Sequence, residues 1–128
     1  MLLEVEIKHK IQFGGNTDEL AGKVLSGEKI VTSSLYAYYR MNLKEMSKVG
    51  DYVSILDSSG NEECVVRIER MEIVQFQNIT EAFAIEEGDS SLCNWLTIHT
   101  EYYSTQSEKL GEKFTGETEL VCEWFRVV

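Results

Sequence analysis

Two side chains suited to acyl-transfer chemistry lie three residues apart in this chain. Lys29 and Thr32 belong to the segment Gly27-Glu28-Lys29-Ile30-Val31-Thr32. A hydroxyl becomes a nucleophile when a neighbouring base takes its proton, and a lysine amine can be that base when apolar surroundings lower its pKa. Ile30 and Val31 would supply such surroundings. An amine and a hydroxyl at this spacing therefore indicate an activated nucleophile.

A helix and a strand must hold this segment in place. Before it, apolar residues recur at helical spacing: Leu20, Ala21, Val24 and Leu25. This periodicity predicts a helix over residues 18–26, with Asn16 and Glu19 placed as a capping box and Gly27 as the stop. Residues 30–39 are rich in β-branched and aromatic side chains, which predicts a strand. The segment then lies at a helix-to-strand junction.

The remaining elements alternate between strand and helix patterns. The sequence predicts a hairpin of segments 51–57 and 62–73 joined at residues 58–61, a short helix over 80–87, a long helix from Ser91 to about Gln106, and a final strand over 119–128. Alternation within the strands predicts a shared core: Val53, Ile55, Val66, Ile68, Val121 and Phe125. Together these elements predict an α+β fold in which helices cover a curved, mainly antiparallel sheet.

Several motifs, in this order along the chain, resemble the ASCH domain of the PUA-like group of small β-barrels. They are Phe13-Gly14, the Gly27-x-Lys29-x-x-Thr32 motif, Val49-Gly50-Asp51, Glu87 to Leu92 with Trp95 and His99 beyond it, and Leu120 to Phe125. These motifs cover nearly the whole chain. The resemblance implies one domain over residues 1–128, with a PUA-like curved antiparallel β-barrel and flanking helices.

The resemblance also implies a catalytic set. Stand-alone ASCH proteins include amidohydrolases that remove an acyl group from the exocyclic amine of a modified cytidine, using a Lys and a Thr of this motif with a downstream Glu. Lys29, Thr32 and Glu87 match these positions, with Glu86 as the alternative acid. Thr32 would attack the acyl carbon, and Glu87 would orient Lys29 or protonate the leaving amine. The competing interpretation is a structural ion pair between Lys29 and Glu87. Ser34 occupies a place where the smaller deacylating enzymes carry an Arg.

A second function uses the same region without catalysis. Aromatic rings near a pocket can stack a base, which is worth on the order of 1–3 kcal/mol per base in single-strand readers. The predicted ligand-binding residues are Ser33, Ser34, Tyr36, Trp95 and His99. The ligand would be a nucleoside or a short RNA, bound by a recognition module. The alternative for the same rings is ordinary core packing.

Composition limits the partners of the chain. With 22 acidic and 12 basic side chains the net charge is −10, so we expect no long duplex nucleic acid as a partner. The sequence has neither an apolar stretch of about 20 residues nor a secretory signal pattern, which predicts a cytoplasmic protein without a membrane span. Three widely spaced cysteines and the lack of a His-Glu-x-x-His motif give no reason to expect a metal or cofactor.

Overall fold

The structure, a computed structural model, describes residues 5–128 and contains one five-stranded sheet. Its strands are β1 (Ile7–Gln12), β2 (Val31–Leu35), β3 (Tyr52–Leu56), β4 (Glu62–Gln75) and β5 (Glu119–Val127). Its helices are α1 (Thr17–Ser26), α2 (Tyr36–Arg40), α3 (Glu81–Glu86) and α4 (Leu92–Lys109), with a 3₁₀ turn, η1 (Phe76–Asn78), after β4. No helix among residues 5–128 is long and apolar enough to cross a bilayer.

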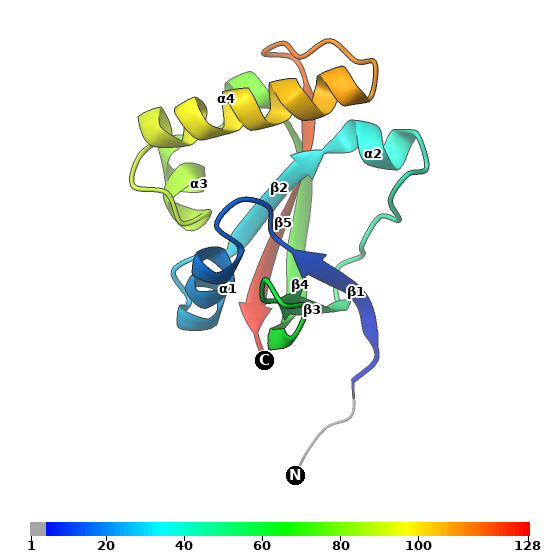
Figure 1. Ribbon diagram of the computed structural model, residues 1–128, viewed down its shortest axis with the longest axis vertical. Helices are drawn as coiled ribbons and strands as arrows, with labels where there is room; N and C mark the ends of the chain where they lie inside the picture. The colour runs from blue at the N-terminus through cyan, green and yellow to red at the C-terminus, as the bar shows by residue number, and fades with distance from the viewer. Residues whose placement is uncertain (1–4) are drawn as a thin grey trace.

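The sheet is curved and has the strand order β1-β3-β4-β5-β2 (Figure 1). β1 pairs with β3 in parallel, and the other three pairings are antiparallel. β1 and β2 are therefore the two edge strands. The prediction of a curved, mainly antiparallel sheet with flanking helices is confirmed.

Two apolar clusters lie on opposite faces of the sheet. On the face that we call the α4 side, Val31, Leu35 and Cys122 of the strands pack with residues of α3 and α4. Figure 1 shows α4 lying across one end of β2 and β5. On the other face, the α1 side, α1 packs through Ala21 and Val24 against the strand residues Val53, Ile55, Val66, Ile68 and Phe125. Because side chains alternate along a strand, β5 contributes to both clusters, with Leu120 and Cys122 on the α4 side and Phe125 on the α1 side.

The predicted core and most predicted helix ends agree with the structure. All six predicted core residues are buried, with at most 5% of Phe125 exposed. Gly27 ends α1 in the left-handed conformation with φ 83°, which a residue with a Cβ rarely adopts. Thr80 and Ser91 cap α3 and α4, because their side chains accept backbone N–H bonds from Phe83 and Asn94.

Three local features differ from the sequence prediction. The strand expected over residues 30–39 ends at Leu35, and residues 36–40 form α2, since aromatic residues are tolerated in helices as well as strands. β1 was not anticipated, because the polar side chains along it obscure a strand whose partner, β3, is distant in sequence. The capping box does not form: Asn16 makes no side-chain cap bond, and Asp18 instead accepts bonds from Ser58.

Candidate functional site

Lys29 lies where the chain passes from α1 into β2, and its side chain is buried. The backbone of this turn is fixed on both sides, since Lys29 N–H donates to the Lys23 carbonyl and Ile30 N–H donates to the Glu86 carbonyl. Only 3% of Lys29 is exposed. Its amine donates to the carbonyls of Val31 at 2.9 Å and Glu87 at 3.1 Å, and Nζ lies 3.7 Å from Glu87 Oε1. These three acceptors match the three protons of an ammonium group.

The Glu87 carboxylate is the centre of this cluster. Glu87 forms the C-terminal cap of α3, and 5% of it is exposed. Oε1 accepts from the backbone N–H of Ser33 at 3.2 Å and from the Ser33 hydroxyl at 2.9 Å. Oε2 accepts from the indole N–H of Trp95. Both carboxylate oxygens therefore have donors from the protein itself.

α4 supplies the aromatic wall of the cluster from one helical face. Trp95 and His99 stack with ring centroids 4.1 Å apart, and His99 Nδ1 donates to the Trp95 carbonyl at 2.9 Å. His99 Nε2 lies 3.8 Å from Glu87 Oε1. The Tyr103 hydroxyl is 2.6 Å from Ser33 Oγ. We call this set the Lys29 network: Lys29, Ser33, Glu87, Trp95, His99 and Tyr103.

Burial dominates the electrostatics of the Lys29 network. It lowers the pKa of the Lys29 amine, and the neighbouring Glu87 carboxylate acts in the opposite direction. Burial also raises the pKa of the Tyr103 hydroxyl well above its ordinary value, so the phenol stays protonated. The network thus contains a desolvated amine and carboxylate whose hydrogen bonds are formed within the protein.

Thr32 lies on the other side of β2. Because side chains alternate along a strand and Ser33 enters the Lys29 network, Thr32 and Ser34 face the α1 side. Thr32 is paired across the ladder with Glu123 of β5. The Ser34 hydroxyl lies 3.0 Å from the Tyr39 hydroxyl. The Thr32 hydroxyl therefore points away from the face of β2 on which Ser33 joins the Lys29 network.

The predicted site residues thus fall into two groups. Five of them meet in the Lys29 network: Lys29, Ser33, Glu87, Trp95 and His99. Thr32 and Ser34 lie on the α1 side, and Tyr36 is the first residue of α2. Of the two candidate acids, Glu87 contacts Lys29, whereas the Glu86 carboxylate lies 3.5 Å from the Trp124 indole nitrogen.

Sequence reasoning did not assign a site role to two buried polar residues. Tyr103 follows Trp95 and His99 at helical spacing, so its place in the network could have been inferred from periodicity. Glu123 interrupts the apolar end of the chain and is only 4% exposed. A lone carboxylate inside an apolar strand is the signal that would have identified it.

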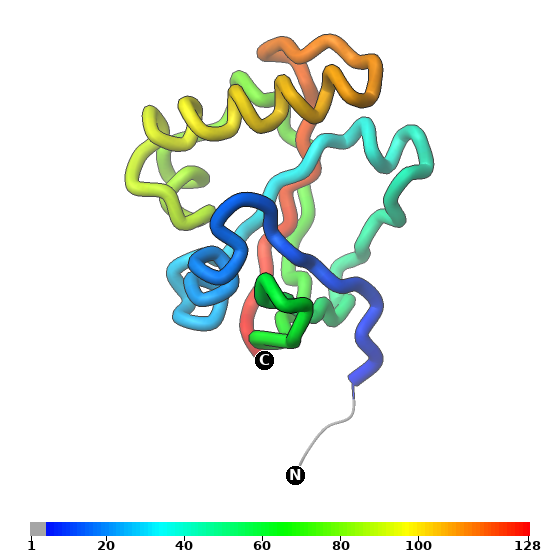
Figure 2. The backbone as a smooth tube through the Cα atoms, in the orientation of Figure 1, coloured from blue at the N-terminus to red at the C-terminus, as the bar shows by residue number. Residues whose placement is uncertain are grey.

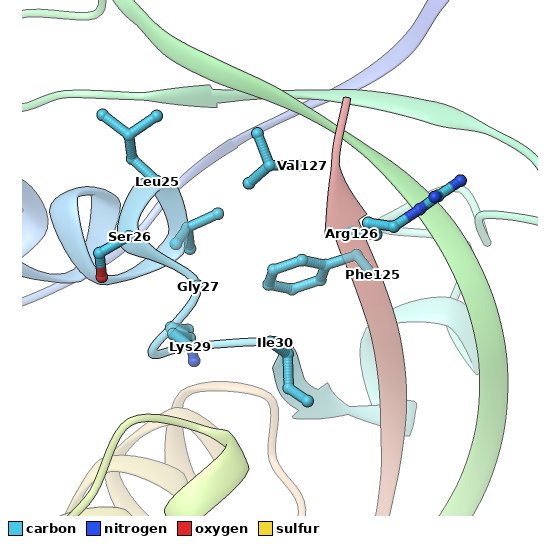
Figure 3. A pocket seen from close by; sticks show the side chains of 9 residues that line it. Leu25, Ser26, Gly27, Lys29, Ile30, Phe125, Arg126 and Val127 are labelled. Atoms are coloured by element: carbon cyan, nitrogen blue, oxygen red, sulfur yellow. The ribbon is translucent and has the colours of Figure 1, made fainter.

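A pocket of about 280 Å³ lies beside the Gly27–Ile30 turn (Figure 3). We call it the motif pocket. It is lined by the end of α1, the turn and the end of β5: Val24, Leu25, Ser26, Gly27, Lys29, Ile30, Phe125, Arg126 and Val127. Figure 3 shows the Lys29 nitrogen pointing away from Phe125 and Val127, so Lys29 contributes its hydrocarbon stem to the wall. None of these lining residues is acidic.

Within residues 5–128, no three His, Cys, Asp or Glu side chains are grouped so that they could hold a metal ion.

Comparison with known proteins identifies the family. The chain matches the ASCH domain over residues 9–128. An ASCH domain from Lactobacillus crispatus JV V101 is 29% identical, with a TM-score of 0.88 over 93% of this chain and 78% of that one. A protein from Enterococcus faecalis V583 is 28% identical, with a TM-score of 0.85 over 100% and 78% of the two chains. A hypothetical protein at 17% identity and a TM-score of 0.59 shares the fold alone. No curated protein matches. The PUA-like fold predicted from the sequence is confirmed, and the chain belongs to the ASCH domain family.

Proposed function

We propose that this ASCH domain is a recognition module that binds a nucleoside or a short single-stranded RNA at the motif pocket. The observation that carries the proposal is the lining of that pocket. The Gly27–Ile30 turn of the motif and the end of β5 form its walls, and no lining residue is acidic. Its volume of about 280 Å³ is just below the range of roughly 300–1,000 Å³ for small-ligand pockets. A pocket of this size suits one nucleoside rather than a folded RNA.

The charge around the pocket supports a nucleotide ligand. The chain carries a net charge of −10, which repels phosphate, but the pocket lining contains Arg126 and no carboxylate. The side chain of Arg126 is 71% exposed, and its Nε pairs with Glu69 at 3.1 Å, which leaves the terminal guanidinium nitrogens to contact a phosphate at the pocket mouth. Leu25 and Ile30, which are 50% and 37% exposed, offer apolar contact to a base.

The Lys29 network supports recognition over catalysis. A general base needs access to the proton that it removes. The Lys29 amine faces three acceptors of the protein, and the Thr32 hydroxyl faces the opposite side of β2. In this arrangement Lys29 anchors the start of β2 beside the motif pocket.

The second candidate function is hydrolysis of an acylated nucleoside by Lys29, Thr32 and Glu87. One observation favours it: burial lowers the pKa of the Lys29 amine, which is the change that a basic lysine requires. This function would also require a route for the proton from Thr32 on the α1 side to Lys29 on the α4 side.

The test of the proposed function is an NMR titration of the labelled protein with cytidine, cytidine monophosphate and a short oligouridylate. Recognition at the motif pocket predicts amide shifts at Gly27, Ile30 and Phe125. Arg126→Ala should weaken binding of the monophosphate about tenfold and leave the nucleoside nearly unaffected, because one charge-assisted hydrogen bond is lost. Arg67→Ala is the matched control, since Arg67 also pairs with Glu69 but does not line the pocket.

An assay with a panel of acylated nucleosides distinguishes the two functions. Release of acyl product that disappears in both Thr32→Ala and Lys29→Arg would favour the hydrolase. Lack of turnover, together with shifts at the motif pocket that Arg126→Ala diminishes, is the result expected for the recognition module. Lack of any shift at the pocket with all three ligands would refute it.

A further inference from the structure

A second group of polar side chains lies on the α1 side of β2 and β5. Thr32 is the cross-strand neighbour of Glu123, and Ser34 is two residues further along the same face of β2. The Tyr39 hydroxyl lies 3.0 Å from Ser34 Oγ. Burial raises the pKa of Tyr39, and Glu123 contributes to the increase, so these two side chains lie in one electrostatic environment. We call Thr32, Ser34, Tyr39 and Glu123 the polar row.

One hydrogen-bond acceptor of the polar row is unsatisfied. Glu123 is 4% exposed, and its Oε2 has no hydrogen-bond partner within residues 5–128. A buried acceptor without a donor costs about 1–3 kcal/mol. Glu87, at a similar burial, has donors on both oxygens. The difference indicates that Glu123 Oε2 is placed for a donor that is not part of the folded chain.

The surroundings of Glu123 favour a neutral donor over a cation. Burial raises the pKa of the carboxyl, while the side chains of Ser47, His9 and Lys44 lower it and Asp51 raises it. Lys44 already places positive charge near the carboxylate. A second cation would be desolvated and repelled by Lys44, whereas a neutral N–H donor would not.

Residues of the loop 41–51 lie near the Glu123 carboxyl, since Ser47 and Lys44 both lower its pKa. Figure 2 shows this loop carrying the chain from α2 at one end of the sheet to β3 at the other. The loop is held at its ends by backbone bonds such as Lys44 N–H to the Tyr38 carbonyl and Gly50 N–H to the Ile68 carbonyl. Within the described part of the chain, residues 45–47 make no backbone hydrogen bond. Local opening of this short stretch requires few bonds to break and uncovers the Ser47 side of Glu123.

We propose that the polar row is a binding site for a neutral carboxamide group. An amide N–H of the ligand donates to Glu123 Oε2, and the ligand carbonyl accepts from a hydroxyl of Thr32 or Tyr39. A carboxamide supplies donors and an acceptor in one plane, which matches a carboxylate flanked by hydroxyls. The inference does not depend on the proposed function, because none of the four residues lines the motif pocket.

Three small benzene derivatives test the proposal: benzamide, N,N-dimethylbenzamide and benzamidinium. Binding to the wild-type protein is followed by NMR through the amides of Thr32, Ser34 and Glu123. Benzamide is expected to shift these amides with a Kd in the millimolar range. N,N-dimethylbenzamide, which lacks the N–H donors, should bind about tenfold more weakly, as expected for loss of a hydrogen bond to a charged acceptor. Benzamidinium should bind no better than benzamide.

Two variants locate the interaction. Glu123→Gln keeps the side-chain size but replaces one acceptor oxygen by a donor, so affinity for benzamide should fall at least about fivefold. Arg126→Ala, which alters the motif pocket, should leave it unchanged. Equal affinity for the two amides, tighter binding of benzamidinium, or shifts confined to residues outside the polar row would each overturn the proposal. The comparison of the three probes on the wild-type protein decides the matter even where Glu123→Gln fails to fold.

Discussion

The side chains of Lys29 and Glu87 lie together in the protein interior, with 3.7 Å between Nζ and Oε1 and exposed fractions of 3% and 5%. Burying two charges is costly, and the cost is offset here by hydrogen bonds from Ser33 and Trp95 to the carboxylate and from the amine to two carbonyls. Removal of either side chain would leave the other buried without its partner.

Removal of one partner should destabilise the fold strongly. Lys29→Met leaves the Glu87 carboxylate buried without its cation, and we expect the free energy of unfolding to fall by about 3–5 kcal/mol. Urea denaturation followed by tryptophan fluorescence measures the change. Lys8→Met is the control: this side chain is 48% exposed and pairs with Glu6 at the surface, so its loss should change stability little. Similar losses in the two variants would show that the buried pair contributes no more to the free energy of unfolding than a surface pair.

The adjacent hydroxyls of Ser33 and Thr32 should respond differently to removal. Ser33→Ala takes one donor from Glu87 and the partner of the Tyr103 hydroxyl, which should cost about 1–3 kcal/mol in stability. Thr32→Val replaces a hydroxyl by a methyl group of similar size on the α1 side and should cost less than about 1 kcal/mol. Thermal denaturation of both variants checks the difference. A larger loss in Thr32→Val would contradict the assignment of the two side chains to opposite faces.

Glu123 should make stability depend on pH above its ordinary titration range. Burial raises the pKa of this carboxyl above the usual value of 4.5. The folded state therefore holds the proton more tightly than the unfolded state, so this contribution to stability is complete below pH 4.5 and is lost as pH rises through the folded pKa. Relative to the wild type, Glu123→Gln should become progressively more stable as pH rises from 4 to 7.

Asp18 provides a control of opposite sign for this pH dependence. Hydrogen bonds from the Ser58 backbone and side chain lower the pKa of its carboxyl. Its contribution is present above the ordinary value of 3.8 and is lost as pH falls through the folded pKa. Asp18→Asn should therefore lose stability relative to the wild type as pH rises. Guanidinium denaturation at a series of pH values measures both trends, and parallel pH profiles for the two variants would exclude the assignment.

The three cysteines should react with iodoacetamide in an order set by burial. Cys93 is exposed, Cys64 is partly buried, and burial raises the pKa of the Cys122 thiol to about 12. Because the thiolate is the reactive form, Cys122 should remain unmodified at pH 8 while Cys93 is alkylated. Mass spectrometry of peptides gives the order, and denaturant should abolish it. Early modification of Cys122 in the folded protein would contradict its burial on the face of β5 that packs against α4.

Local rules were sufficient to predict the elements that surround the site. The helix before Gly27, the caps at Thr80 and Ser91, and the hairpin at residues 58–61 follow from turn and capping chemistry that acts over a few residues. The core strands followed from alternation. β1 was missed because a parallel pairing is set by partners distant in sequence.

The sequence alone does not show which hydroxyls of β2 face Lys29 and Glu87. Alternation along residues 31–35 shows that Thr32 and Ser33 face opposite ways, but not which of them faces Lys29 and Glu87. That choice depends on how α3 and α4 pack on one face of β2, a long-range contact. The predicted set of Lys29, Thr32 and Glu87 follows the motif, whereas the contacts in the structure include Ser33.

The Lys29 amine donates a hydrogen bond to the carbonyl of Val31, the first residue of β2. The spacing of the motif therefore helps to set the register of β2 along β5. An edge strand has a neighbour on one side only, and the register of β2 along β5 is also held by the buried Val31 and Leu35, which a slip by one residue would turn out of the core. Such a slip would exchange the two hydroxyl sets of β2, placing Thr32 before Glu87 and Ser33 before Glu123. Lys29 fixes the start of the strand from within the protein, and it thereby determines which hydroxyls are available to each of the two sites.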